Sequence, residues 1–302
     1  MIPRRRTNNV KLQSLLLLAL LAVPSAAIDI PGSWTAPVEP FRVAGNIYYV
    51  GTAELSSWLI VTPEGYFLLD APLEENVELI LGNIEKLGFD PKKIRVLLNS
   101  HAHLDHAGGL AAIKAKTGAR LYLSKADAEL AARGGCDDFA FGDDAAYPPV
   151  TADVILRDGQ GVTLGGVAPG GTTLVAYLTP GHTKGNTTWT TRVREGDREL
   201  FVIFAPSLSA PGYELVGNAA YPEIVDDYRA TFERLGNIAD PASPTPDIFL
   251  STHGSFFDLE KKAAALRAGG TENPFISPDE LREFVEYWRE HFEQNLAKQQ
   301  EK

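Results

Sequence analysis

A strand, a histidine-rich loop and a helix follow one another between residues 94 and 115, and this order constrains the fold more than any other stretch. The apolar run 94–99 predicts a buried strand, and the periodicity of 110–115, after a pair of glycines, predicts a helix. Between them lie three histidines and an aspartate within six positions: His101-Ala102-His103-Leu104-Asp105-His106. This arrangement is typical of an α/β sheet, which binds ligands beyond the carboxyl ends of its strands.

The spacing of these side chains indicates a metal site. His101 and His103 are two residues apart, so an extended backbone directs both to one side. Asp105 and His106 follow where the chain has begun to turn and can point to a second position, and ions at two such positions could lie about 3.5–4 Å apart, as in two-metal hydrolases. The alternative is a polar loop in which Asp105 only caps the helix. That alternative would not explain why three of the six histidines lie here.

Two further histidines occupy the same local context. His182 follows a predicted strand at 173–177, and His253 follows another at 248–250. A single histidine after a strand is more often structural than a ligand, but five in one context favour a metal site. Only His291 lies in a charged, helix-like stretch.

These motifs resemble the metallo-β-lactamase superfamily. The resemblance rests on the cluster at 101–106, on Gly181-His182 and on His253, and it extends from about residue 40 to about residue 270. Three segments look more narrowly like the third subclass of class B β-lactamases: 180–183, 207–213 and 217–218. The resemblance implies an α/β (α+β) fold, an αββα sandwich of two mixed sheets flanked by helices.

The resemblance also implies two Zn²⁺ ions per chain, each with three protein ligands: His101, His103 and His182 for the first, and Asp105, His106 and His253 for the second. Three protein ligands leave one coordination position of a tetrahedral zinc open, and an open position is typical of catalytic zinc. Zinc lowers the pKa of bound water to about 7, so a metal-bound hydroxide would attack the β-lactam amide. Asp105 would orient that hydroxide. The implied activity is hydrolysis of penicillins, cephalosporins and carbapenems, which gives antibiotic resistance.

Residues near the expected second metal position bear on the substrate. Glyoxalase-type and lactone-cleaving relatives carry an aspartate there, and the first β-lactamase subclass carries a cysteine, but the stretch 204–209 has neither. By resemblance, the hydroxyls of Ser207 and Ser209 would bind the carboxylate of a β-lactam. Alternatively, Ser207 satisfies only backbone groups in a turn. Phe139 and Phe141, in the long loop 133–150, either cover the active site or anchor the loop on the core.

Several positions depart from the family pattern without removing a ligand, namely Pro206, the turn at 70–72 and the segment after His253. They bear on substrate range. Two alternatives to a β-lactamase therefore stay open. One is another binuclear zinc hydrolase of the superfamily, a lactonase, thioesterase or esterase. The other is a non-catalytic metal-binding protein, which complete ligand sets argue against.

The first 27 residues predict an export signal. Arg4, Arg5, Arg6 and Lys11 precede an apolar run at 15–23, and small residues allow cleavage near Ala27. That run is too short for a membrane-spanning helix, although an uncleaved anchor is an alternative. We expect a periplasmic protein with one domain at 28–302, ending in a charged helix at about 278–298.

The composition excludes some partners. Cleavage removes four basic and no acidic side chains, so the net charge moves from −11 to −15. Such a surface repels nucleic acid and anionic lipid, so we expect no nucleic-acid partner. The resemblance implies a small-molecule β-lactam substrate, and we expect a monomer with no membrane contact after cleavage. Cys136 is the only cysteine, so no intramolecular disulfide can form, and we expect an unpaired thiol on an exposed loop.

Overall fold

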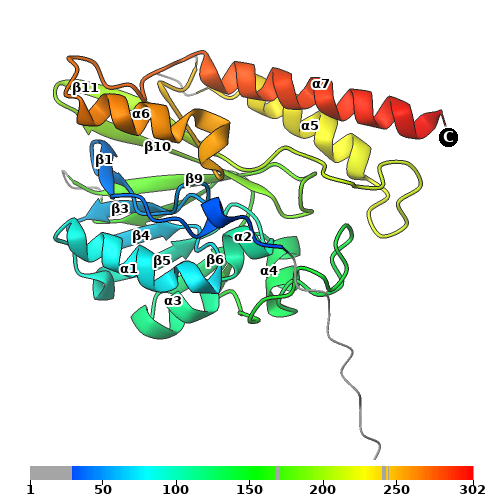
Figure 1. The fold of residues 1–302 in the computed structure, drawn as a ribbon, viewed down its shortest axis with the longest axis horizontal. Coiled ribbons are helices and arrows are strands. Elements are labelled where there is room, and N and C mark those ends of the chain that lie inside the picture. Colours follow the sequence, from blue (N-terminus) through cyan, green and yellow to red (C-terminus); the bar gives the residue numbers. More distant parts are fainter. Residues whose placement is uncertain (1–28, 167–169, 240–242, 244, 302) are drawn as a thin grey trace, which may run out of the picture.

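Two β-sheets lie face to face, and helices cover the outer side of each (Figure 1). The computed structural model describes residues 29–166, 170–239, 243 and 245–301. The predicted αββα sandwich is confirmed. The predicted export segment, residues 1–27, lies outside the described residues.

The first sheet has seven strands that lie side by side in chain order. They are β1 (Phe41–Ala44), β2 (Ile47–Tyr49), β3 (Trp58–Thr62), β4 (Gly65–Leu69), β5 (Ile94–Leu98), β6 (Arg120–Leu123) and β7 (Val154–Ile155). Strands β1 to β4 pair antiparallel, and β4 to β7 pair parallel. Parallel neighbours need long crossovers. The crossovers carry α1 (Val77–Lys86), α2 (Leu104–Ala107), α3 (Leu110–Thr117) and α4 (Lys125–Ala132).

The second sheet has five strands in the order β12-β11-β10-β9-β8. They are β8 (Gln160–Leu164), β9 (Thr172–Leu178), β10 (Thr187–Glu195), β11 (Arg198–Ala205) and β12 (Ile248–Ser251). Only β11 and β12 pair parallel. Its outer face is covered by α5 (Ile224–Gly236), α6 (Leu259–Arg267) and α7 (Glu280–Gln300) (Figure 1).

Four short 3₁₀ helices complete the described elements: η1 (Gly32–Trp34), η2 (Glu74–Asn76), η3 (Pro91–Lys93) and η4 (Gly254–Phe257). The helix predicted at the C-terminus is α7, shifted by two residues at each end. Among the described residues, no helix combines the length and the apolar character that crossing a membrane requires. Cys136 is a free thiol of intermediate exposure in the loop after α4.

Two strands, β1 and β8, were not predicted from the sequence. In β8 only Val162 is buried, and in β1 the first two of four residues are partly or fully exposed. Both strands lie at a sheet edge, where one side of the backbone has no strand partner. Their short and partly polar sequences give little hydrophobic alternation, and the pairing depends on the neighbouring strand.

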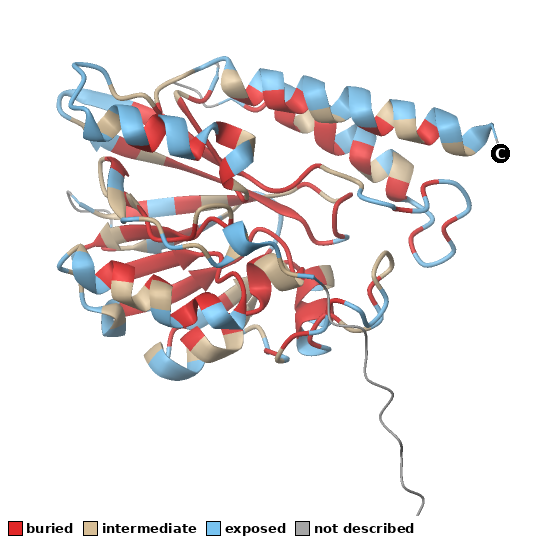
Figure 2. Cartoon of the chain, viewed as in Figure 1, coloured by how far each residue is buried: buried red, intermediate tan, exposed pale blue. Residues whose placement is uncertain are grey.

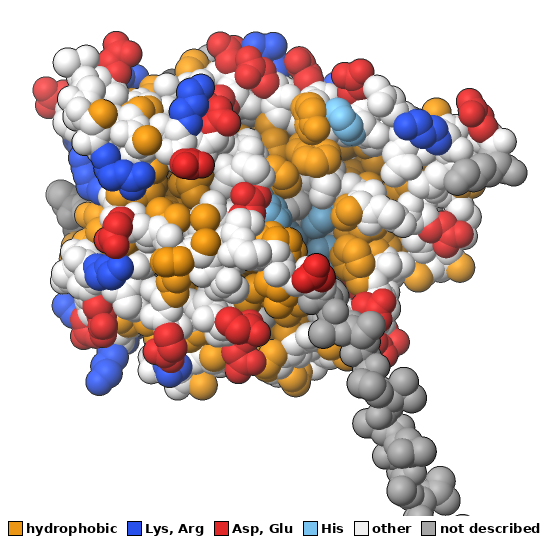
Figure 3. All heavy atoms as spheres, viewed as in Figure 1, with side chains coloured by type: hydrophobic (Ala, Val, Ile, Leu, Met, Phe, Trp, Pro, Cys, Tyr) orange, Lys and Arg blue, Asp and Glu red, His pale blue; other side chains and the backbone are white. Residues whose placement is uncertain are grey.

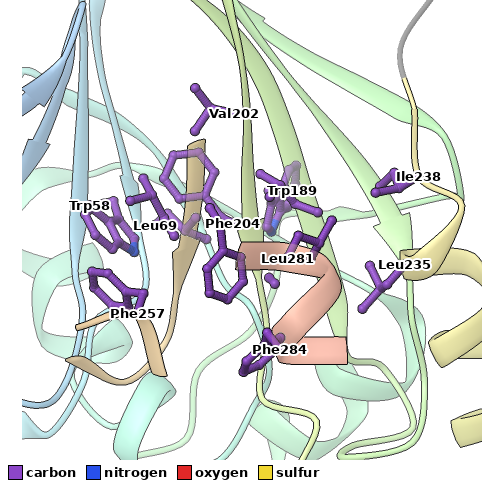
Figure 4. Packing of buried hydrophobic residues seen from close by; sticks show 14 of the residues in the cluster. Trp58, Leu69, Trp189, Val202, Phe204, Leu235, Ile238, Phe257, Leu281 and Phe284 are labelled. Carbon is purple, nitrogen blue, oxygen red and sulfur yellow. The ribbon is translucent and has the colours of Figure 1, made fainter. Parts of the chain in front are cut away.

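Large side chains from both sheets fill the space between them (Figure 4). The Trp58 ring, on β3, lies 5.8 Å from that of Phe204, on β11, and 5.6 Å from that of Phe257, on η4. Figure 2 shows that buried residues follow the strands and the inner sides of the helices, while the outer sides of the helices are exposed. This core holds the two sheets, and hence the strand ends, in one arrangement.

We predict that Phe204→Ala lowers the free energy of unfolding by about 3–5 kcal/mol, because it leaves a cavity where a side chain only 3% exposed fills the contact between the sheets. Urea denaturation measures the effect. Tyr287→Ala is the control, since Tyr287 is 52% exposed on α7, and its change should stay within about 0.5 kcal/mol. Equal effects of the two substitutions would contradict the placement of Phe204 in the core.

Candidate metal centre

The predicted site residues lie where strands end, at one edge of the sandwich. His101 comes three residues after β5, His182 follows β9, Ser207 follows β11 and His253 follows β12. Asp105 and His106 lie on the short helix α2. The first sheet therefore supplies one part of the cluster and the second sheet the other. Figure 3 shows histidine side chains within a hollow that hydrophobic side chains border.

The structure brings all six predicted ligands together. Nδ1 of His103 lies 3.2 Å from Nε2 of His182, which comes from the other sheet. Nε2 of His106 lies 3.1 Å from Nε2 of His253. Oδ2 of Asp105 lies 3.1 Å from Nε2 of His106 and 3.4 Å from Nε2 of His253. Residues up to about 150 positions apart in the chain thus direct ligand atoms to one place.

The imidazole of His101 lies between these two pairs. Its ring centre is 4.4 Å from that of His106 and 4.6 Å from that of His182. Two groups of ligand atoms, each within 4.8 Å of one another, share it: His101, His103 and His182, and His101, Asp105 and His106. The first group is the predicted first trio. The second has His101 where the prediction has His253, although His253 is also within 3.4 Å of its other two members.

The donor set fits metal ions. Tetrahedral zinc with Zn–N bonds of about 2.0–2.1 Å places its ligand atoms about 3.3 Å apart, and the nitrogen pairs across the two sheets are 3.2 and 3.1 Å apart. Nε2 of the fully buried His101 has no hydrogen-bond partner among the residues that the structure describes. A buried polar atom without a partner is costly, and a cation between the rings would satisfy it.

The protonation states of three proposed ligands also suit a cation. Burial lowers the pKa of His101 well below its usual value and that of His182 to about 3, so both imidazoles are neutral at physiological pH. Burial opposes the ionisation of Asp105, but the charge and hydrogen bonds of His106 and His253 outweigh it and hold the pKa well below its usual value. Neutral imidazole and ionised carboxylate are the forms that bind metal. His253 differs: burial lowers its pKa, but Asp105 and Glu54 outweigh burial and raise the pKa to about 9, so a metal ion would have to displace its proton.

Neighbouring oxygens fix the ring orientations. The second nitrogen of His182, Nδ1, lies 2.7 Å from the carbonyl oxygen of Ser209, and that of His101 lies 3.1 Å from Oγ of Ser100. The hydroxyl of Tyr213 donates a 3.0 Å hydrogen bond to the carbonyl of His182. Such outer contacts hold the other ring nitrogen toward the metal position.

Asp127, on α4, links the two ligand-bearing loops. Its carboxylate accepts hydrogen bonds from Ala102 N at 2.9 Å, from Gly185 N at 3.0 Å and from Thr183 Oγ1 at 2.9 Å. A Cβ at Gly185 would lie 2.1 Å from Oγ of Ser124, so only glycine allows this approach. No sequence pattern predicts this role for Asp127, because its partners lie far away in the chain and only the fold brings them to it.

A groove of about 410 Å³ opens over the cluster. Phe141 lines it, with its ring centre 5.1 Å from that of His103, and Ser207 and Ser209 line it as well. Phe139 instead packs on Tyr213 and Tyr221 and does not line this groove. Each of the two predicted roles therefore belongs to one residue: Phe141 borders the groove, and Phe139 anchors the loop.

Two aromatic residues of the groove were not predicted. Trp34, on η1, and Phe256, on η4, both line it, and their ring centres lie 6.1 and 4.9 Å from that of His253. Trp34 precedes the first strand, in a segment with no pattern of its own. Only the tertiary fold brings it to the site.

Asp70, directly after β4, holds the two residues that precede His101. Its Oδ1 accepts hydrogen bonds from Asn99 Nδ2 at 2.8 Å and from Ser100 N at 2.7 Å. Its backbone φ is 63°, a left-handed conformation that costs free energy in a non-glycine residue. Burial raises the pKa of Asp70 to about 6, despite these hydrogen bonds.

We predict that Asp70→Asn becomes more stable relative to the native protein as the pH rises from 4 to 7 in chelator-treated protein. A raised folded-state pKa means that the folded state binds more protons than the unfolded state between about pH 4 and 6, so ionisation of Asp70 lowers the free energy of unfolding in that window. Denaturant titrations at several pH values measure the difference.

The control for this prediction is Asp153→Asn. Asp153 accepts a 2.7 Å hydrogen bond from Leu121 N and pairs with Lys114, which outweigh burial and lower its pKa below the usual value. Its contribution changes only below about pH 4, so the stability difference should stay flat from pH 4 to 7. An equally flat difference for Asp70→Asn would show that Asp70 is already ionised at pH 4.

Comparison with known proteins places this site in a family. Residues 52–195 match the model of the metallo-beta-lactamase superfamily. A metallo-β-lactamase of Cronobacter sakazakii with a HARLDQ motif is 45% identical, with a TM-score of 0.82, over 89% of this chain and 98% of that one. At residues 101–106 this chain has histidine at the third and sixth positions of that motif, His103 and His106.

Two further solved structures agree. BJP-1, a subclass B3 metallo-β-lactamase of Bradyrhizobium japonicum, is 39% identical, with a TM-score of 0.81, over 89% of this chain and 97% of that one. FEZ-1 from Legionella gormanii is 40% identical, with a TM-score of 0.82, over 88% of this chain and 98% of that one. The chain therefore belongs to the metallo-β-lactamase superfamily, and its matches are to enzymes of subclass B3 type.

Proposed function

We propose that this enzyme hydrolyses the amide bond of β-lactam antibiotics with two zinc ions. The observation that carries the proposal is the convergence of five imidazoles and one carboxylate on the floor of an open groove. The related β-lactamases support the substrate class. The lactonase, thioesterase or esterase alternative has no feature of this structure in its favour.

In the proposed ligand set, His101, His103 and His182 hold the first zinc, and Asp105, His106 and His253 hold the second. Bound there, zinc would supply water that ionises near neutral pH and would polarise a carbonyl. His101 belongs to both groups of ligand atoms, and we assign it to the first zinc because His253 can take its place in the second group. His253 joins the second because its Nε2 is 3.1 Å from that of His106 and 3.4 Å from Oδ2 of Asp105.

Asp105 has the further role of holding the attacking water. Its contacts with His106 and His253 both use Oδ2. Oδ1 can therefore accept a hydrogen bond from the water and direct its lone pair at the substrate carbonyl. No serine or cysteine nucleophile is needed in this scheme.

The groove residues position the substrate. Oγ of Ser207 lies 2.9 Å from Oγ1 of Thr252. A hydroxyl both accepts and donates, so Ser207 can accept from Thr252 and still donate to a substrate carboxylate. Ser209, which is partly exposed, offers a second donor. Trp34, Phe141 and Phe256 give the groove apolar walls for the substituents of the antibiotic.

We further propose that the protein is exported to the periplasm after cleavage near Ala27 and acts as a monomer of one domain, residues 28–302. The support is the basic and apolar character of residues 1–27. A periplasmic location would place the enzyme where β-lactams reach their targets. Cell fractionation and the N-terminal sequence of the mature chain test this proposal.

Hydrolysis of a carbapenem and a cephalosporin by the purified zinc-loaded protein tests the function. We expect turnover that a chelator abolishes and added zinc restores, because the proposed reaction takes its water nucleophile from the metal site. Lactone and thioester substrates serve as the comparison. Turnover of those alone, with two zinc ions bound, would overturn the β-lactamase proposal and leave the metal site in place.

His182→Ala tests the ligand assignment. The substitution removes one of three first-site ligands, so we expect loss of the first zinc and of most activity, measured by metal analysis and by turnover. His291→Ala is the matched control, because His291 lies on α7 and belongs to neither metal-ligand group. Retention of both zinc ions at native affinity by His182→Ala would rule out His182 as a ligand.

A further inference from the structure

We propose that Glu54 is a positioning residue that orients His253 for the second metal position. The inference rests on the proposed ligand set, in which His253 binds the second zinc. Glu54 lies between β2 and β3, about 200 positions from His253 in the chain. No sequence motif marks this residue.

Glu54 holds the segment after β12 through both its backbone and its side chain. Leu55 forms an isolated antiparallel bridge with His253, and the carbonyl of Glu54 accepts a 2.6 Å hydrogen bond from Gly254 N. The carboxylate accepts hydrogen bonds from Ser255 N at 3.2 Å and from Ser255 Oγ at 2.5 Å. These contacts fix the carboxylate itself, so it can in turn fix a neighbour.

That neighbour is the imidazole of His253. Its Nδ1 lies 3.4 Å from Oε1 of Glu54, while its Nε2 faces His106 and Asp105. A carboxylate at Nδ1 favours the tautomer with the proton on that nitrogen, which leaves the lone pair of Nε2 directed at the metal position. The two ring nitrogens thus have separate partners.

His253 has more need of such support than the other histidines of the proposed ligand set. Its side chain is 14% exposed, whereas those of His103 and His106 are 5% and 0% exposed. Packing holds the buried rings, but a ring at the mouth of the groove keeps more rotational freedom. A fixed carboxylate acceptor removes that freedom.

The first metal position does not depend on Glu54. Nδ1 of His101 and Nδ1 of His182 face neutral oxygens, those of Ser100 and Ser209. Nε2 of His103 faces the carboxylate of Asp138, at 3.7 Å, and not that of Glu54. Loss of Glu54 should therefore weaken one metal position and spare the other.

The test is a titration of the metal-free protein with zinc against a chromophoric chelator, which gives two stepwise dissociation constants. We expect Glu54→Ala to weaken the second by about 10–100-fold and to leave the first unchanged. Glu54→Gln keeps an acceptor oxygen but loses the charge, so its effect should be smaller. Nitrogen NMR of labelled histidines provides a second readout: the Nδ1 signal of zinc-bound His253 should shift in Glu54→Ala, because its carboxylate partner is lost.

The matched control is Glu195→Gln. Glu195 also accepts a backbone hydrogen bond, from Gly45 N at 2.6 Å, and pairs with Arg42, but it lies at the end of β10 away from the cluster. Both zinc constants should be native in this variant. Unchanged constants and an unchanged Nδ1 signal of zinc-bound His253 in Glu54→Ala, or equal weakening of both constants, would overturn the proposed role of Glu54.

His253→Ala separates this inference from the ligand set on which it rests. If His253→Ala loses the second zinc while Glu54→Ala keeps it, the ligand set stands and the role of Glu54 is wrong. If His253→Ala keeps the second zinc, the ligand set itself is wrong. Loss of the second zinc in His253→Ala together with a weakened second constant in Glu54→Ala supports both.

Discussion

The metal centre depends on how the two sheets meet at one edge. Strand β10 joins the first sheet there: Nε1 of Trp189 donates a 3.0 Å hydrogen bond to the carbonyl of Asn99, and Thr187 N donates a 2.7 Å hydrogen bond to that of Ser100. These carbonyls belong to the two residues before His101. Because the ligand atoms come from both sheets, a shift of one sheet along the other would separate them. The buried core between the sheets prevents that shift, so stability and ligand geometry share one cause.

Two buried carboxylates near the cluster bear on its charge balance. Asp70 and Asp127 are almost fully buried, and burial raises the pKa of each to about 6. Without an opposite charge nearby, buried carboxylates are costly to ionise. Two divalent cations at the proposed positions would supply that charge and lower both pKa values again. The carboxylates that shape the ligand loops therefore also balance the ions those loops are proposed to hold.

The clustering of six side chains could be predicted because strand-end histidines and the six-residue motif are local patterns, and the family resemblance that these motifs carry implied the sandwich. The sequence could not predict contacts that only the tertiary fold creates. Asp127 and Glu54 touch loops far away in the chain, and Trp34 comes from a segment without periodicity. The sequence of the loop at 133–150 also could not show which role Phe139 and Phe141 each have, because two aromatic residues with one intervening position can face opposite ways. Both rings contact Tyr213 in the structure, but only Phe141 contacts His103 and only Phe139 contacts Tyr221 among the described residues.

The side chain at position 207 can change which substrates the fold accepts. In relatives with an aspartate there, a carboxylate would add negative charge beside the metals. Here Ser207 is only 2% exposed and bonded to Thr252, and its carbonyl accepts a 3.1 Å hydrogen bond from Asn186 Nδ2. The position is therefore rigid and neutral. A neutral hydroxyl beside two cations favours an anionic group of the substrate, whereas a carboxylate would repel it. Since β-lactams carry a carboxylate next to the scissile ring, the absence of an acid at residue 207 is consistent with the proposed substrate class.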